Sequence, residues 1–196
     1  MNNISSAVLN TITAKVNVEI KDVLGIGTCG TAFETKCGRV LKFTSQVAEA
    51  ANSWGIIGHS LTHTVTVFDV GAVRGDNSEV IGYYILQEKV DTSRLAPVVR
   101  QLEDYAEDCY GDTFDGLVFR SNRSELALPE GHIKALDNFV TACKELNQYD
   151  ICGVDIASGN VGTDENGTFK IFDIDSDTSD YEAIFIDHIN EQNEAA

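Results

Sequence analysis

A short glycine-rich segment near the N-terminus joins two stretches that both have the composition of β-strands. It carries Gly25, Gly27 and Gly30 in a Gly-x-Gly-x-x-Gly spacing. The residues before it alternate between apolar and polar from Val16 to about Leu24, which predicts a half-buried strand. A dinucleotide-binding loop of this spacing leads into a helix, whereas the sequence after Gly30 predicts a second strand. We therefore expect either an ordinary hairpin turn or a flap whose backbone amides cover the phosphates of a nucleotide.

The rest of the first half is also predicted to be rich in β-structure. Four further strands are expected, at 31–35, 39–44, 64–73 and 81–90. An alanine-rich segment from Ser45 to Trp54 predicts a helix of about three turns, with Ser45 as its N-cap. About five strands and one helix are therefore expected before residue 91.

The second half has a helical pattern instead. Apolar residues recur at helical spacing over 98–110 and, more regularly, over 132–149. The polar segment 111–130 between them predicts a loop or a poorly ordered insertion. A short β-hairpin is expected over 160–173 and a last helix near 180–189. Together the two halves predict an α+β protein with a join near residues 91–97.

The chain is strongly acidic, with 31 acidic and 14 basic residues and a formal net charge of −17. Such a surface repels phosphate backbones and anionic lipids, so we expect no binding to nucleic acid or membranes. No segment approaches the about 20 apolar residues of a membrane span, and the N-terminus does not resemble a signal peptide. Five scattered cysteines without a Cys-x-x-Cys motif predict reduced thiols and a cytoplasmic protein. A polyanionic ligand would therefore need backbone amides, a placed lysine or a divalent metal.

A lysine lies within the apolar strand expected at 39–44. Lys42 is flanked by Leu41 and Phe43, so its side chain points to the opposite face of the strand from theirs. Glu49, on the helix expected next, could pair with Lys42 and hold the ammonium group near two phosphates. The alternatives are that Lys42 faces solvent and that Glu49 is one of many solvated carboxylates.

A second group of polar residues lies in the last third of the chain. Asp155 is followed five positions later by Asn160, and Asp173 ends the expected hairpin. Mg²⁺ prefers hard oxygen ligands, usually one or two carboxylates with phosphate oxygens and water. Asn160 and Asp173 suit that role, which leaves Asp155 free to orient a hydroxyl group. A loop of turn-forming residues is the alternative.

Taken in chain order, these motifs resemble those of the protein kinases, from about Val16 to Asp173. The resemblance implies a single two-lobed domain over 1–196. Its β-rich N-lobe would span about 1–90, and a truncated helical C-lobe about 91–196. The segment 155–160 most resembles small, atypical kinase-like proteins, including those of bacteriophages.

The resemblance also implies a role for each motif, with ATP and Mg²⁺ as cofactors. Lys42 and Glu49 would be the strand lysine and helix glutamate, and Asp155 the catalytic aspartate. Asn160 and Asp173 would bind the metal. The remaining assignments concern the nucleotide: Gly25, Gly27 and Gly30 as the glycine loop, Phe33 as the apolar residue that covers the nucleotide, and 85–90 as gatekeeper and hinge, with Glu88 and Val90 at the adenine edge.

Two departures from the kinase pattern bear on function. The His-Arg pair that usually precedes the catalytic aspartate is Gly153-Val154, and the Phe-Gly after the metal-binding aspartate is Ile174-Asp175. The 23 residues after Asp173 are too few for an activation segment and the later helices of the C-lobe. We therefore expect the usual platform for a peptide substrate to be missing or supplied by a partner.

Three functions are compatible with these motifs. The first, which we favour, is a minimal serine/threonine-protein kinase, a phosphotransferase that acts on protein hydroxyls. The second is an inactive pseudokinase that binds a nucleotide or a host protein in the host cytoplasm. The third is a small-molecule kinase of the aminoglycoside or choline type. The substrate and the oligomeric state do not follow from the sequence.

Overall fold

The computed structural model describes residues 4–110, 117–118, 126, 128–152, 157–174 and 181–194. The chain divides into two compact units. The sheet unit consists of residues 1–60, 66–89 and 175–196, and the helical unit of residues 61–65 and 90–174. The second segment of the sheet unit ends at residue 89. The division into an N-lobe of about 1–90 and a C-lobe of about 91–196 stays a prediction. Residues 61–65 belong to the helical unit, and the C-terminal helix belongs to the sheet unit.

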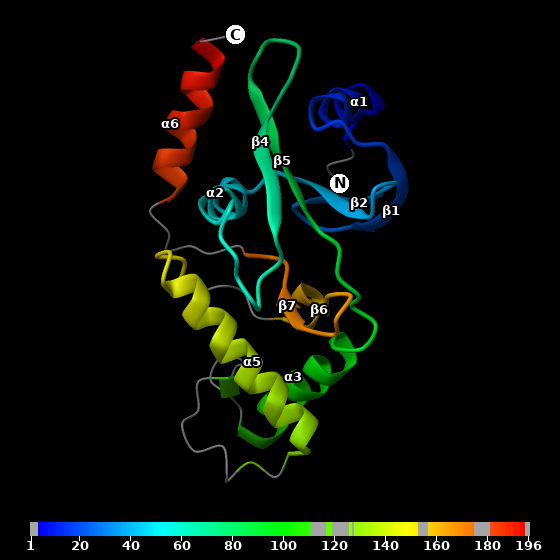
Figure 1. The fold of residues 1–196 in the computed structure, drawn as a ribbon, viewed down its shortest axis with the longest axis vertical. Coiled ribbons are helices and arrows are strands. Elements are labelled where there is room, and N and C mark those ends of the chain that lie inside the picture. Colours follow the sequence, from blue (N-terminus) through cyan, green and yellow to red (C-terminus); the bar gives the residue numbers. More distant parts are fainter. Residues whose placement is uncertain are drawn as a thin grey trace. The chain divides into compact units, whose positions relative to one another are not determined.

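The sheet unit is built on a five-stranded antiparallel sheet in the order β1-β2-β3-β5-β4 (Figure 1). All five predicted strands are present. The first begins four residues later than predicted, and most of its side chains are exposed rather than alternately buried. The strands are β1 (Ile20–Ile26), β2 (Gly30–Thr35), β3 (Arg39–Thr44), β4 (Val67–Arg74) and β5 (Val80–Glu88).

A helix that the sequence did not predict, α1 (Ser6–Lys15), covers one face of this sheet. Ser5 is its N-cap, since its hydroxyl accepts a hydrogen bond from the backbone N–H of Val8 at 3.3 Å. The buried cluster on this face combines α1 with strands β3, β4 and β5. Val16 and Val18 pack against the cluster from the segment that follows α1. Their alternation therefore indicated burial rather than a strand. The buried members are Ile12, Leu41, Phe43, Val73, Tyr84 and Leu86.

The other face carries α2 (Val47–Gly55) and α6 (Tyr181–Glu194). Tyr83 and Tyr84 are consecutive in β5 and so point to opposite faces. Tyr84 joins the α1 cluster, whereas the ring of Tyr83 lies 5.6 Å from that of Phe185 in α6. Phe185 also lies 5.9 Å from Trp54 of α2. The predicted last helix is thus confirmed, but it extends beyond residue 189 and packs on the sheet.

The helical unit contains the two predicted helices, α3 (Ala96–Tyr110) and α5 (Glu130–Asn147). The predicted hairpin is also present, as β6 (Val161–Thr163) and β7 (Phe169–Ile171), preceded by the 3₁₀ turn η2 (Ser158–Asn160). The ring of Phe169 packs edge-on against Phe139 of α5 at 4.8 Å. None of the helices in the described ranges is both long and apolar enough to cross a membrane.

Two segments extend this core. Residues 61–65 add to the hairpin, because Thr64 forms a parallel bridge with Ile171 and Val65 N–H donates to the Ile171 carbonyl at 2.9 Å. The segment 111–130 was predicted as a loop, but its described residues include Leu117 and Val118, which are helical and buried. Most of that segment lies outside the described residues.

Candidate functional site

The three glycines lie at the turn from β1 to β2, with Gly25 in β1, Gly27 in the connecting loop and Gly30 at the start of β2. Their surroundings differ. A Cβ atom added at Gly25 would meet nothing within 4 Å, and one at Gly27 would meet only the carbonyl oxygen of Gly30, at 3.9 Å. A Cβ at Gly30 would lie 1.9 Å from the carbonyl oxygen of Phe43 in β3. Gly30 is therefore required by the close approach of β2 to β3. Gly25 and Gly27 instead leave the loop backbone open on one side.

The C-terminal end of this loop is fixed to the segment that leads into α2. The carbonyl oxygen of Cys29 accepts hydrogen bonds from Ser45 N–H at 2.8 Å and from the Ser45 hydroxyl at 3.1 Å. Ser45 was predicted as the N-cap of the helix, but Gln46 occupies that position and makes no side-chain cap. The prediction was wrong because the Ser45 hydroxyl holds the glycine loop instead.

Lys42 of β3 and Glu49 of α2 form an ion pair, as the sequence suggested. The side chain of Glu49 is 3% exposed and that of Lys42 is 18% exposed, so the pair is open to water only at the lysine. The strand register sets Lys42 opposite Ala32, and Ala32 opposite Gly25. Directly opposed residues share a face of the sheet. Lys42 therefore lies on the same face as the open position of the glycine loop.

Phe33 does not lie on this face. It follows Ala32 directly, and its partner in the register is Leu41, a member of the α1 cluster. Consecutive strand residues point to opposite faces, and Phe33 is itself buried. The prediction that Phe33 covers a nucleotide beside Lys42 is therefore wrong. Ala32 occupies the position beside Lys42. Since residues two apart in a strand share a face, counting in steps of two from Gly30 would have indicated Ala32.

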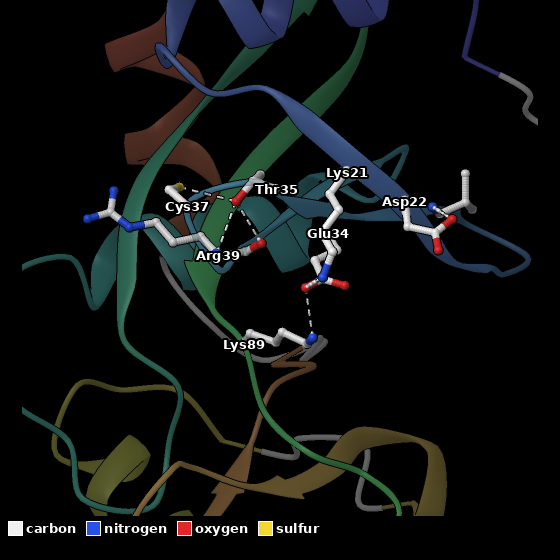
Figure 2. A network of polar contacts seen from close by, with 8 residues as sticks. Lys21, Asp22, Glu34, Thr35, Cys37, Arg39 and Lys89 are labelled. Carbon is white, nitrogen blue, oxygen red and sulfur yellow. Dashed lines mark hydrogen bonds and ion pairs between the residues drawn. The ribbon is translucent and has the colours of Figure 1, made fainter.

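An ion-pair network connects β2 with the end of β5 (Figure 2). Glu34 lies two residues after Ala32, and its carboxylate binds the ammonium groups of Lys21 at 2.8 Å and Lys89 at 3.0 Å. These two cations lower the pKa of the Glu34 carboxyl, and the hydrogen bond from Lys21 contributes most. Lys89 belongs to the predicted hinge 85–90, so Glu34 holds the C-terminal part of the hinge against β2.

Glu88 and Val90, which were predicted to lie at the adenine edge, each make contacts within their own unit. The backbone N–H of Glu88 donates to the Thr66 carbonyl at 2.8 Å, and the Glu88 carboxylate accepts from Thr66 N–H at 3.0 Å. The amide of Glu88 is thus already used and is not a donor for an adenine edge. Val90 packs on the helical unit, where a Cβ at Gly162 would lie 2.7 Å from its Cγ2. Adenine binding at Val90 stays a prediction.

In the helical unit, the hairpin register brings Asn160 and Asp173 to the same end. Val161 pairs with Ile171, and Phe172 N–H donates to the Asn160 carbonyl at 3.0 Å. Asp173 is the next residue, and both side chains are half-buried. One carboxylate and one carboxamide suit a Mg²⁺ ion that also keeps water and phosphate oxygens. Asp155, the third residue of this set, lies outside the described residues.

No group of three His, Cys, Asp or Glu side chains within the described ranges is arranged to hold a metal. This finding does not concern Asn160, whose carboxamide is a different ligand type. Asn160 and Asp173 would therefore supply two protein ligands at most from the described hairpin. A cation there would need further oxygen ligands from a bound phosphate or from water, as Mg²⁺ commonly takes.

We expect the loss of Lys42 to destabilise the protein through Glu49. In Lys42→Met, the 3%-exposed carboxylate of Glu49 loses the ammonium group that compensates its charge. Breaking one side of a buried ion pair costs about 3 kcal/mol. Urea unfolding of the full chain should show this loss. The double variant Lys42→Met/Glu49→Leu should recover most of it, because no buried charge remains.

The matched control is Lys36→Met. Lys36 also pairs with a glutamate, Glu19, but the two side chains are 64% and 74% exposed. Surface ion pairs contribute little to stability, so this variant should unfold like the wild type. Equal losses in Lys42→Met and Lys36→Met would contradict a special role for the buried pair.

A scan against protein-family models found no match, and a search of curated proteins also found none. Among solved structures, the chain is similar to a MAP kinase from Leishmania major, with a TM-score of 0.50 and 12% sequence identity. The similarity covers 88% of this chain and 51% of the kinase chain, so this chain spans about half the length of that structure. At this identity the similarity concerns the fold alone. The chain has a kinase-like α+β fold.

Proposed function

We propose that this chain is an ATP- and Mg²⁺-dependent phosphotransferase that acts on serine or threonine hydroxyls of a protein substrate. The observation that carries the proposal is the buried Lys42–Glu49 pair, which shares a sheet face with the open part of a glycine loop. Burying a glutamate carboxylate costs desolvation free energy unless the carboxylate pairs with a cation, which it then orients. The lysine side chain is partly exposed, and an ammonium group binds phosphate oxygens through charge-assisted hydrogen bonds.

Each side chain has a defined role in this proposal. Amides of the segment 25–30 cover the phosphates, apart from the Gly27 amide, which donates to the Gly30 carbonyl at 2.9 Å. The open side of Gly25 leaves room for the ligand. Lys42, oriented by Glu49, binds the phosphates that are not transferred. Asn160 and Asp173 hold Mg²⁺, which supplies charge stabilisation to the transferred group. Asp155 orients the substrate hydroxyl and accepts its proton late in the transfer.

A second function, binding without catalysis, is favoured by the position of α6. This helix follows Asp173 in the chain, yet it packs on the sheet unit, against Trp54 and Tyr83. It therefore does not enlarge the helical unit, where protein kinases hold a peptide substrate. The replacement of the usual His-Arg pair by Gly153-Val154 also favours binding without catalysis. In this role the chain would be a pseudokinase that engages a partner protein.

Thermal unfolding and radiolabel transfer together separate the two functions. A ligand at about 100 times its Kd stabilises a protein by about 2.7 kcal/mol, which corresponds to a rise in Tm of roughly 5–10 °C for a chain of this size. We expect ATP with Mg²⁺ to give such a rise and ATP alone a smaller one. We also expect label from ATP to appear on serine or threonine in a peptide library.

Each other outcome has a distinct meaning. A rise in Tm without transfer to any acceptor would support the pseudokinase. Transfer to an aminoglycoside or choline, but not to peptides, would support a small-molecule kinase. No change in Tm with either form of ATP would contradict all nucleotide-based functions, because Lys42 and the glycine loop would then bind no triphosphate.

A further inference from the structure

A cavity of about 310 Å³ lies in the sheet unit at the edge formed by β4, where α1 and the C-terminal part of α6 both reach. It is formed by α1, the edge strand β4 and the C-terminal part of α6. Its lining is mainly apolar and includes Val8, Ile12, Val73 and Ile189, with the ring of Tyr84. Tyr84 points away from the face that carries Lys42, so the cavity is separate from the proposed nucleotide site.

Two cations line this apolar cavity, Lys15 at the end of α1 and Arg74 at the end of β4. The chain has more than twice as many acidic as basic residues. Even so, neither cation forms an ion pair with a carboxylate in the part of the chain that the structure describes. Both charged side chains that line the cavity are therefore positive, and neither has a carboxylate within ion-pair distance among the described residues.

The contacts of these cations leave them able to bind an anion. The Arg74 guanidinium donates to the carbonyls of Ser78 at 2.9 Å and Ile189 at 3.2 Å. A guanidinium has five N–H donors, so more remain. The Lys15 ammonium lies 5.2 Å from the centre of the Tyr84 ring. Both cations are thus positioned at the cavity by groups that do not neutralise them.

The carboxylate of Asp69 borders the lining, where it accepts a hydrogen bond from the Tyr84 hydroxyl at 3.2 Å. Burial, and then the charge of Asp69, raise the pKa of Tyr84 well above its ordinary value. Tyr84 therefore stays neutral, and its hydroxyl group donates its hydrogen bond to the Asp69 carboxylate. Its ring offers an apolar wall and adds no negative charge to the cavity.

We propose that this cavity binds a small amphiphilic anion, with its carboxylate or phosphate head at Lys15 and Arg74 and its alkyl chain along Val8, Ile12, Val73 and Ile189. At about 30 Å³ for each water-sized group, the cavity of about 310 Å³ has room for about ten such groups, which is about the number of non-hydrogen atoms in octanoate. A charge-assisted hydrogen bond beside apolar walls is stronger than one in water. This site does not depend on the proposed phosphotransfer.

The direct test is calorimetric titration of the full chain with four ligands that share an octyl chain. Octanoate and octyl phosphate carry the anionic head, 1-octanol is neutral, and octylammonium is cationic. We expect both anions to bind, octanol to bind at least about tenfold more weakly, and octylammonium not to bind. A preference between the two anions identifies the head group. Equal binding of octanol, or any binding of octylammonium, would overturn the proposal.

Variants locate the site. Lys15→Gln and Arg74→Gln should each weaken octanoate by about tenfold and leave octanol unchanged, which a purely structural role of either cation would not do. Lys144→Gln removes the same charge from an exposed position on α5 and should have no effect. Val8→Phe, which fills the cavity, should weaken all binding, and octanoate should shift the methyl NMR signals of Ile12, Val73 and Ile189. Unchanged octanoate affinity in both cation variants, or methyl shifts confined to other residues, would overturn the proposal.

Discussion

Alanine at Asp173 is expected to lower phosphoryl transfer from radiolabelled ATP by at least about a thousandfold. Asp173 provides the carboxylate at the end of the β6–β7 hairpin, beside Asn160. Without it, Mg²⁺ loses its only acidic ligand in the proposed set, and the transferred group loses its charge stabilisation. The rise in Tm that Mg²⁺ adds to ATP should disappear in the same variant.

The companion variant Asp155→Ala separates metal binding from the orientation of the substrate. It should lose transfer as well, since no carboxylate remains to orient the hydroxyl group and accept its proton. However, it should keep the Mg²⁺-dependent rise in Tm. Asp187→Ala is the matched control, because Asp187 is an exposed carboxylate of α6 in the sheet unit. Full activity in Asp173→Ala or Asp155→Ala would show that the assigned roles are wrong.

Local patterns predicted most of the elements of this fold. The strands predicted at 31–35 and 39–44 and the helical spacing over 98–110 and 132–149 have bounds close to those of β2, β3, α3 and α5. The missed helix, α1, has threonines, asparagine and valine where strong helix formers would stand, so its propensity is low. It is stable because Ile12 is buried against the sheet, and a tertiary contact of that kind leaves no local signal.

In the candidate site too, a contact between neighbouring elements could be predicted from the sequence, whereas the strand register and the distant hydrogen-bond partners could not. The Lys42–Glu49 pair could be proposed because a strand and the next helix supply its members, and both elements were correctly predicted. Phe33 was misassigned because one residue of strand register changes the face on which a side chain lies. Ser45 was misassigned because its hydroxyl has a distant partner, Cys29, that sequence spacing does not indicate.

The packing of α6 could not be predicted for a related reason. An amphipathic pattern predicts that a helix has a buried face, but not which element covers it. Phe185 is fully buried against Trp54 and Tyr83, residues more than 100 positions away in the chain. Gly55 of α2 permits α6 to pack closely on α2, because a Cβ at Gly55 would lie 2.7 Å from the ring of Tyr181 in α6.

Substitution by alanine should destabilise the protein strongly at Gly30 and hardly at all at Gly25. Gly30→Ala places a Cβ 1.9 Å from the backbone oxygen of Phe43, and the paired strand cannot move away without breaking its ladder. We expect the free energy of unfolding in urea to fall by about 4 kcal/mol or more. Gly25→Ala meets no atom within 4 Å and should change that free energy by less than about 0.5 kcal/mol.

Nucleotide binding distinguishes these glycines further. The new methyl group of Gly25→Ala would occupy the open space on the face of Lys42, where the phosphates of ATP are proposed to lie. We therefore expect its affinity for ATP with Mg²⁺ to fall by about tenfold, although the fold is intact. Wild-type ATP affinity in Gly25→Ala would mean that the loop does not approach a nucleotide. Gly30 would then be explained by strand packing alone, and the glycine spacing would be that of an ordinary hairpin.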